Sequence, residues 1–153
     1  MQNDFFNRTQ ACDDSLNSAI ANINAALDLF RERNLPIFVI QHKSKHLVPG
    51  KSGFDVHDSV KLKPHDIRIV KTYRNSFKKT GLAEQLRKLG VDTVIVTGYS
   101  AEYCVLSTYK GARNFDFTPM VLKGSLASKK PEKIRSVEEI TESISYGALK
   151  TLL

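Results

Sequence analysis

Residues 91–104 have the sequence VDTVIVTGYSAEYC, the most informative stretch of the chain. Val91 to Thr97 are rich in β-branched residues, which is typical of a buried strand. Gly98 permits a sharp turn at the end of this strand. Residues 103–113 then predict a helix. The stretch therefore predicts a strand, a turn and a helix, with Cys104 in the first helical turn.

The segments on either side predict further strands and helices in alternation. A continuous apolar run at 36–40 predicts a strand, and 67–70 and 117–122 predict further strands; the polar residues 43–66 predict a long loop. Three amphipathic helices are predicted from apolar residues at spacings of three and four. Their inward residues are Leu16, Ile20, Ile23, Leu27 and Phe30; Leu82, Leu86 and Leu89; and Ile134, Val137, Ile140 and Ile144.

Capping residues set the expected limits of these helices. The first is capped at Asp13, Asp14 or Ser15 and ends at Asn34 and Pro36; the second runs from Thr80 to Gly90; the last runs from Pro131 to Gly147. The alternation predicts one α/β domain over residues 1–153, with three α/β/α layers and a mostly parallel sheet. Such a domain normally opens with a strand, whereas this chain opens with a loop-like segment and a helix. A first strand is therefore expected to be missing.

Composition narrows the class of protein. The 153 residues carry a net charge of +7, but the basic residues are scattered and no aromatic residues interleave with them, so nucleic-acid binding is not expected. The N-terminus resembles no secretory signal and no run is long enough to span a membrane. With only two cysteines, a disulfide scaffold is excluded. We expect a cytoplasmic protein whose partner is a small-molecule substrate.

Two candidate catalytic residues follow strand ends, where parallel sheets place their sites. At Cys104, unpaired N–H groups at the start of a helix stabilise a thiolate and can donate to the oxyanion of an attacked carbonyl. The alternative is that Cys104 is a small buried hydrophobe. Lys71 directly follows Val70, and its ammonium group suits a neighbouring thiolate or a developing negative charge, although most lysines are merely solvated.

Other catalytic patterns are absent. Glu102 occupies the place of the second glycine in Gly-x-Ser-x-Gly, and no phosphate-binding loop is present. His42 and His46 lie in a loop without an accompanying Asp-x-His, so no metal site and no cofactor is predicted. His57 and His65 are expected to be exposed polar residues.

Three ordered segments resemble the signatures of isochorismatase-like cysteine hydrolases, which are Rossmann-type α/β enzymes. They are Met1-Gln2-Asn3-Asp4-Phe5, Lys71 within VKTYRNSFKKTGL, and TGYSAEYCVLST. The resemblance implies that the Cys104 thiolate attacks an amide or related carbonyl and forms a thioester that water hydrolyses, while Lys71 stabilises charge. It further implies a cis peptide bond between Tyr99 and Ser100 that directs the Ser100 N–H, with that of Cys104, at the oxyanion. Members commonly form homo-oligomers.

The chain also departs from the family. The resemblance places a proton-transferring aspartate immediately before the segment that starts at Met1, at the end of a central first strand. Asp4 corresponds to a different family position. Without that strand, two neighbouring strand edges would be unpaired, so we expect a truncated reading of a longer protein rather than a natural short form. If the short form is natural, a catalytically impaired binding or assembly subunit becomes the alternative, and a basic nucleic-acid-binding module is a third hypothesis.

The subfamily and the substrate stay open. Gln41-His42 lacks the Asp-x-His pattern of the metal-dependent nicotinamidases, and Lys123-Gly124-Ser125 replaces an acidic stretch common in the family. Candidate substrate-binding residues lie near the three motifs, and core packing or surface exposure is an equally good interpretation of each. They are Phe5, Gln41, His42, Tyr73 and Tyr103.

Overall fold

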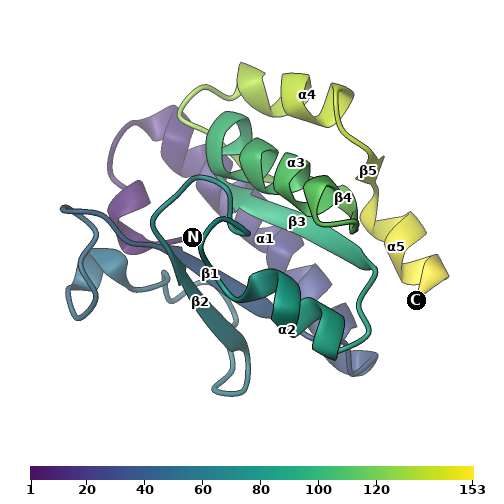
Figure 1. Ribbon diagram of the computed structural model, residues 1–153. Helices are drawn as coiled ribbons and strands as arrows, with labels where there is room; N and C mark the ends of the chain where they lie inside the picture. The colour runs from purple at the N-terminus through teal and green to yellow at the C-terminus, as the bar shows by residue number, and fades with distance from the viewer.

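Five strands form two parallel sheets in the computed structural model, which describes residues 1–153 (Figure 1). The strands are β1 (Phe38–His42), β2 (Ile67–Lys71), β3 (Thr93–Tyr99), β4 (Thr118–Ala127) and β5 (Ser143–Ile144). β1 pairs with β2, whereas β3, β4 and β5 form the second sheet in that order. Every pairing between these strands is parallel, as the sequence predicted.

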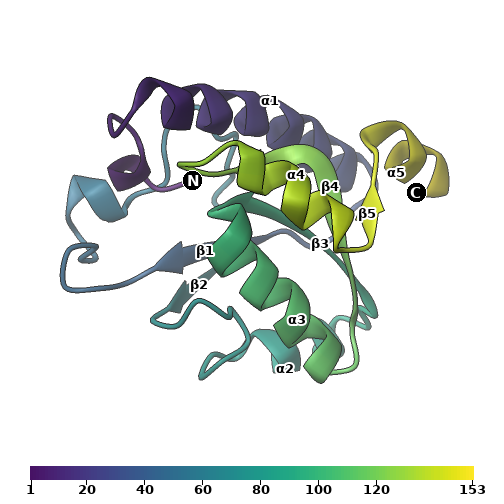
Figure 2. The ribbon, with the colours of Figure 1, turned by 90° about the horizontal axis from the view of Figure 1, so that it is seen from above.

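Helices cover both faces of the strands (Figure 2). They are α1 (Gln10–Glu32), α2 (Leu82–Lys88), α3 (Leu106–Asn114), α4 (Glu132–Glu139) and α5 (Tyr146–Leu152). Shorter turns are η1 (Asn3–Phe5), η2 (Ser52–Phe54) and the π-helical η3 (Ala101–Val105). Apolar clusters join α1 and α5 to β4 and β5 on one face, and α2, α3 and α4 pack on the other. The predicted α/β fold with flanking helices is confirmed. None of these helices has both the length and the apolar composition that a membrane span requires.

β1 and β3 begin two residues later than predicted, because the preceding helices use those residues to close. After α1, the Leu35 N–H bonds to Phe30 and Asn34 has a φ of 55°. After α2, the Val91 N–H bonds to Leu86 in the same way. This pattern satisfies carbonyl groups at the end of each helix. The predicted strand limits at Pro36 and Val91 are therefore corrected to Phe38 and Thr93.

Two predicted N-caps are also corrected. Thr9, rather than a residue at 13–15, caps α1, and its side chain accepts a hydrogen bond from the Cys12 N–H. The N-cap of α2 is Gly81 rather than Thr80.

The last predicted helix, over 131–147, is wrong as a single element. It ends at Glu139, and Ile144 lies instead in β5, where it pairs with Leu122. Ile144 is buried against α1 and α5, whereas Ile140, which was predicted to face inward, is 67% exposed. The edge of β4 thus takes up a short strand, and a new helix that contains Gly147 follows.

The two sheets are separated by a space that we call the slot, between the facing edges of β1 and β3. No backbone hydrogen bond joins these two strands. The slot is part of a cavity of about 1040 Å³, and 30 of its 45 lining residues are hydrophobic. Protein interiors contain few voids larger than a water molecule, so this cavity is not an ordinary packing defect. It leaves Val94, Ile95 and Val96 only half-buried, although their sequence predicts a strand covered on both faces.

Close packing at Gly111 predicts the first mutational effect. In α3, a Cβ added at Gly111 would overlap the side-chain amide of Asn75. This amide is fixed because its Oδ1 accepts a hydrogen bond from the Phe77 N–H at 2.9 Å. We expect Gly111→Ala to lower the free energy of unfolding by about 1–3 kcal/mol, measured by urea denaturation.

The matched control is Gly147→Ala in α5, where nothing lies within 4 Å of an added Cβ. This change should be neutral or slightly stabilising because alanine favours the helix. A Gly111→Ala protein as stable as the parent would contradict the described packing.

Candidate active site

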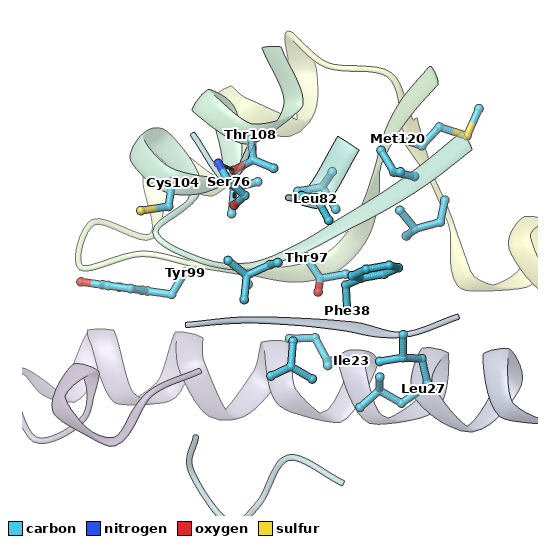
Figure 3. Close-up of a pocket in the computed structure, with 18 of the residues that line it drawn as sticks. Ile23, Leu27, Phe38, Ser76, Leu82, Thr97, Tyr99, Cys104, Thr108 and Met120 are labelled. Atoms are coloured by element: carbon cyan, nitrogen blue, oxygen red, sulfur yellow. Dashed lines mark hydrogen bonds between the residues drawn. The ribbon is translucent and has the colours of Figure 1, made fainter. Parts of the chain in front are cut away.

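The carboxyl ends of β2 and β3 bring Lys71 and Cys104 together. Lys71 is the last residue of β2, and Cys104 follows β3 in η3. The Lys71 Nζ lies 3.3 Å from the Cys104 Sγ, so the ammonium group can donate a hydrogen bond to the sulfur. Lys71 is buried, whereas Cys104 is partly exposed and lines the cavity (Figure 3). The two residues predicted independently from strand ends therefore form one site.

The remaining donors of Lys71 are used by the chain that follows it. Its Nζ donates to the carbonyl oxygens of Tyr73 and Arg74, each at 2.9 Å. An ammonium group has three donors, and the sulfur is the third acceptor. Because each of its three N–H donors has an acceptor, the Lys71 ammonium group is held beside the Cys104 sulfur.

Side chains of α3 fix the loop that carries these carbonyl groups. The Thr108 Oγ1 accepts a hydrogen bond from the Ser76 N–H at 3.1 Å and lies 2.8 Å from the Ser76 Oγ. Asn75 packs directly against Gly111 one turn further along α3. These contacts fix the loop after Lys71 against α3, the helix that follows Cys104.

The turn that contains Cys104 is π-helical rather than the first turn of an α-helix, which corrects the predicted element. The Val105 N–H bonds to the Ser100 carbonyl at 3.2 Å. Gly98 has a φ of 114°, which favours glycine and accompanies a register shift between β3 and β4. The peptide bond between Tyr99 and Ser100 is cis.

Glu102 links this turn to the end of β4. Its carboxylate accepts a hydrogen bond from the Ser100 Oγ at 2.7 Å. It also accepts from the Ser128 Oγ, at 2.9 Å for the nearer oxygen. The Ser128 N–H in turn donates to the Ser15 Oγ on α1. Through this hydrogen-bond network, Ser100 is linked to Ser128 after β4 and to Ser15 on α1.

The structure brings three of the five candidate substrate-binding residues to the cavity. Phe5, His42 and Tyr103 line it, and Tyr103 is 49% exposed. Phe5 packs on the Tyr99 ring, with centroids 4.6 Å apart, and the Arg74 guanidinium lies over the Tyr103 ring.

Gln41 and Tyr73 are not among the residues that line the cavity. Gln41 is buried and donates to the Phe54 carbonyl. The ring of Tyr73 lies beneath the ammonium groups of Lys78 and Lys79. Of the other predicted polar residues, His46 and His65 are exposed, and His57 is half-buried because it stacks on Phe6.

Burial and the charge of Lys71 both lower the pKa of His42. Burial lowers the pKa of this imidazole, and the Lys71 ammonium lowers it further. His42 is therefore neutral near pH 7, and its buried Nδ1 has no hydrogen-bond partner. No group of three or more His, Cys, Asp or Glu side chains gathers to hold a metal ion.

Cys12 provides a contrast with Cys104. It lies in the first turn of α1 and is fully buried, and burial, reinforced by Asp13, raises the pKa of its thiol. Its neighbour Tyr99 also has a pKa raised to about 12, mainly by burial. Cys12 thus belongs to the core.

Some residues of the site were not found from the sequence. Ser128 follows β4, but β4 was predicted to end at Leu122, so Ser128 did not stand at a predicted strand end. Thr108 lies four residues after Cys104, a spacing that places two helical side chains on one face. That spacing was the one available signal for Thr108.

Comparison with known proteins identifies the family. The isochorismatase domain family matches residues 1–138. The chain is 32% identical over 111 residues to the uncharacterized isochorismatase family protein YrdC of Bacillus subtilis, covering 70% of this chain and 59% of that protein. The chain belongs to the isochorismatase family.

Two further matches define the range of similarity. The chain is 24% identical over 109 residues to ureidoacrylate amidohydrolase RutB of Caulobacter vibrioides, covering 71% of this chain and 48% of the enzyme. The structure is similar to that of an isochorismatase family protein from Desulfovibrio vulgaris, with a TM-score of 0.89 and 21% identity over 99% of this chain and 93% of that one. The chain thus spans about half to three-fifths of the length of YrdC and RutB.

The different surroundings of the two thiols predict different reactivity. We expect iodoacetamide to alkylate Cys104 at neutral pH at least about tenfold faster than Cys12, because Cys12 is buried with a raised pKa. Peptide mass mapping after timed alkylation measures both rates in one sample. Equal and slow modification of both thiols would contradict the described site.

Proposed function

We propose that this chain is a thiol hydrolase of small amides or related carbonyl compounds, with Cys104 as nucleophile. The observation that carries the proposal is the 3.3 Å contact between the Lys71 Nζ and the Cys104 Sγ at the edge of a cavity. A buried ammonium group beside a sulfur favours the thiolate, which is the nucleophilic form. The relative named as an amidohydrolase supports an amide substrate.

The reaction would proceed in two stages. The thiolate attacks the carbonyl carbon, and the resulting oxyanion is stabilised by the Ser100 and Cys104 N–H groups together with the Lys71 charge. The carbon–nitrogen bond then breaks, the amine nitrogen takes a proton from solvent, and a thioester forms. Water next attacks the thioester, the carbon–sulfur bond breaks to release the carboxylic acid and restore the thiolate, and one proton returns to solvent. Glu102 would act by holding Ser100 in place.

A second candidate function is a binding or assembly subunit without catalysis. The observation that favours it is the absence of a free carboxylate beside Cys104. Among the residues that line the cavity, the only carboxylates are Asp92 and Glu102. Asp92 precedes β3, at the opposite end from Cys104, and Glu102 is occupied by two serine hydroxyls. A group that carries protons between the thiol, the amine and water is therefore not supplied by these residues.

Removal of the sulfur tests the nucleophile directly. The parent chain should release ammonia or amine from a member of a panel of small primary amides, ureides and N-carbamoyl amino acids. Cys104→Ala should reduce this rate at least about a thousandfold, because the covalent route is lost. Cys12→Ala is the matched control and should retain the rate of the folded parent.

Mass spectrometry of the parent during turnover should show an acyl group on Cys104. Hydrolysis that survives Cys104→Ala would contradict the proposal. A folded parent chain that binds members of the panel without hydrolysing them would favour the binding subunit.

Replacement of the lysine tests the role of its charge. Lys71→Met should slow alkylation of Cys104 at neutral pH by about ten- to a hundredfold, since a hydrogen bond to a charged group contributes about 1.5–3 kcal/mol. Lys78→Met is the control, because Lys78 is exposed and lies over Tyr73. Alkylation at the parent rate in Lys71→Met would show that the ammonium group does not stabilise the thiolate.

A further inference from the structure

Positive charge gathers at the end of the cavity where the strands finish. The charged side chains that line the cavity are Lys71, Arg74, Asp92, Glu102 and Lys129. The three basic residues all follow strand ends: Lys71 closes β2, Arg74 lies in the next loop, and Lys129 comes two residues after β4. Asp92 precedes β3 at the opposite end. Glu102 is therefore the one lining carboxylate among these cations.

Two of the three cations have no anionic partner. The Lys71 ammonium group is used by the Cys104 sulfur and two carbonyl oxygens. Neither Arg74 nor Lys129 takes part in an ion pair. The Glu102 carboxylate accepts hydrogen bonds from serine hydroxyls instead. This end of the cavity therefore attracts anions.

The guanidinium group of Arg74 is held ready for a ligand. It lies over the ring of Tyr103, with its central carbon 4.4 Å from the ring centroid. Stacking occupies one face of the guanidinium and leaves the N–H donors in its plane free. These donors form a fork that matches the two oxygens of a carboxylate. Tyr103 directly precedes Cys104, and the Arg74 carbonyl holds the Lys71 ammonium, so this fork belongs to the same site.

The rest of the cavity is apolar. Cys104 and Tyr99 lie at one end of it, and Leu27 and Met120 lie toward the other (Figure 3). A carboxylate placed among apolar side chains would lose its hydration without compensation. An anionic group is therefore bound at the charged end, where Arg74 is exposed.

We propose that Arg74 determines specificity, and that the substrate is a small amide that also carries a carboxylate. The guanidinium binds this carboxylate at the mouth of the cavity while the amide carbonyl lies at Cys104, and Lys129 adds positive charge. Monoamides of short dicarboxylic acids have both groups. The inference rests on the proposed hydrolase function and names the class of substrate.

Iodoacetate and iodoacetamide are matched reagents for this test. Each forms a carbon–sulfur bond with loss of iodide, and they differ in a carboxylate against a neutral amide. The measured quantity is the ratio of the iodoacetate rate to the iodoacetamide rate at Cys104. Because both reagents need the thiolate, this ratio is independent of how much thiolate is present. At low ionic strength the parent ratio should exceed that of N-acetylcysteine at least about fivefold.

Replacement of Arg74 removes the fork and keeps the backbone. Arg74→Gln should lower the ratio at least about fivefold, because a charge-assisted hydrogen bond is lost while the carbonyl that holds Lys71 stays. Lys78→Gln is the matched control. It removes the same charge from the same loop, but Lys78 lies over Tyr73 and does not line the cavity, so the parent ratio should be kept.

Equal ratios in Arg74→Gln and Lys78→Gln would overturn the proposal, because only the overall charge would then matter. A parent ratio equal to that of N-acetylcysteine would also overturn it.

Protection of Cys104 from iodoacetamide tests the substrate class. Malonamate, succinamate and glutaramate are compared with neutral analogues in which a methyl ketone replaces the carboxylate, such as levulinamide for succinamate. At least one of these acids should protect at about tenfold lower concentration than its analogue, and Arg74→Gln should remove the difference. Absence of protection by all three acids, or equal protection by the neutral analogues or by inorganic phosphate, would overturn the proposal.

These measurements separate the inference from the proposed function, since neither needs turnover. A parent chain that shows the expected ratios and protection but hydrolyses no amide would contradict the hydrolase and leave the carboxylate site in place. Hydrolysis of the neutral analogues as fast as the acids would contradict the inference alone.

Discussion

The site depends on one contact, between the ammonium group of Lys71 and the sulfur of Cys104. These residues are distant in the sequence and meet because β2 and β3 end at the same edge of the fold. The contact is maintained by the loop after β2, whose carbonyl groups hold the ammonium and whose Ser76 is locked to Thr108 on α3. The parallel direction of β2 and β3 brings Lys71 and Cys104 together, and local hydrogen bonds fix the geometry of their contact.

The sequence predicted the elements whose signal is local. The apolar run at 91–97 and the glycine at 98 located the strand and turn before Cys104, and strand ends indicated Lys71. Elements that depend on distant contacts were not predicted. β4 continues past Leu122 because β3 pairs with it through a register shift, and Ile144 joins β5 because the edge of β4 is free to pair. The network of Glu102 and Ser128 was missed for the same reason.

The slot explains why β3 is less buried than its composition suggests. The structure has two sheets, and no backbone hydrogen bonds join the facing edges of β1 and β3. The residues of β3 are apolar on both sides, which suits a central strand and not an edge. The slot and the candidate active site share one cavity.

The effect of Lys71 on the surroundings of the Cys104 side chain is the most direct test of the central contact. The chain is prepared with carbon-labelled cysteine, and the Cβ resonances of Cys12 and Cys104 are recorded at neutral pH by carbon NMR. The account predicts that Lys71→Met shifts the Cys104 resonance and leaves that of the buried Cys12 in place. A Cys104 resonance unchanged by Lys71→Met would contradict it.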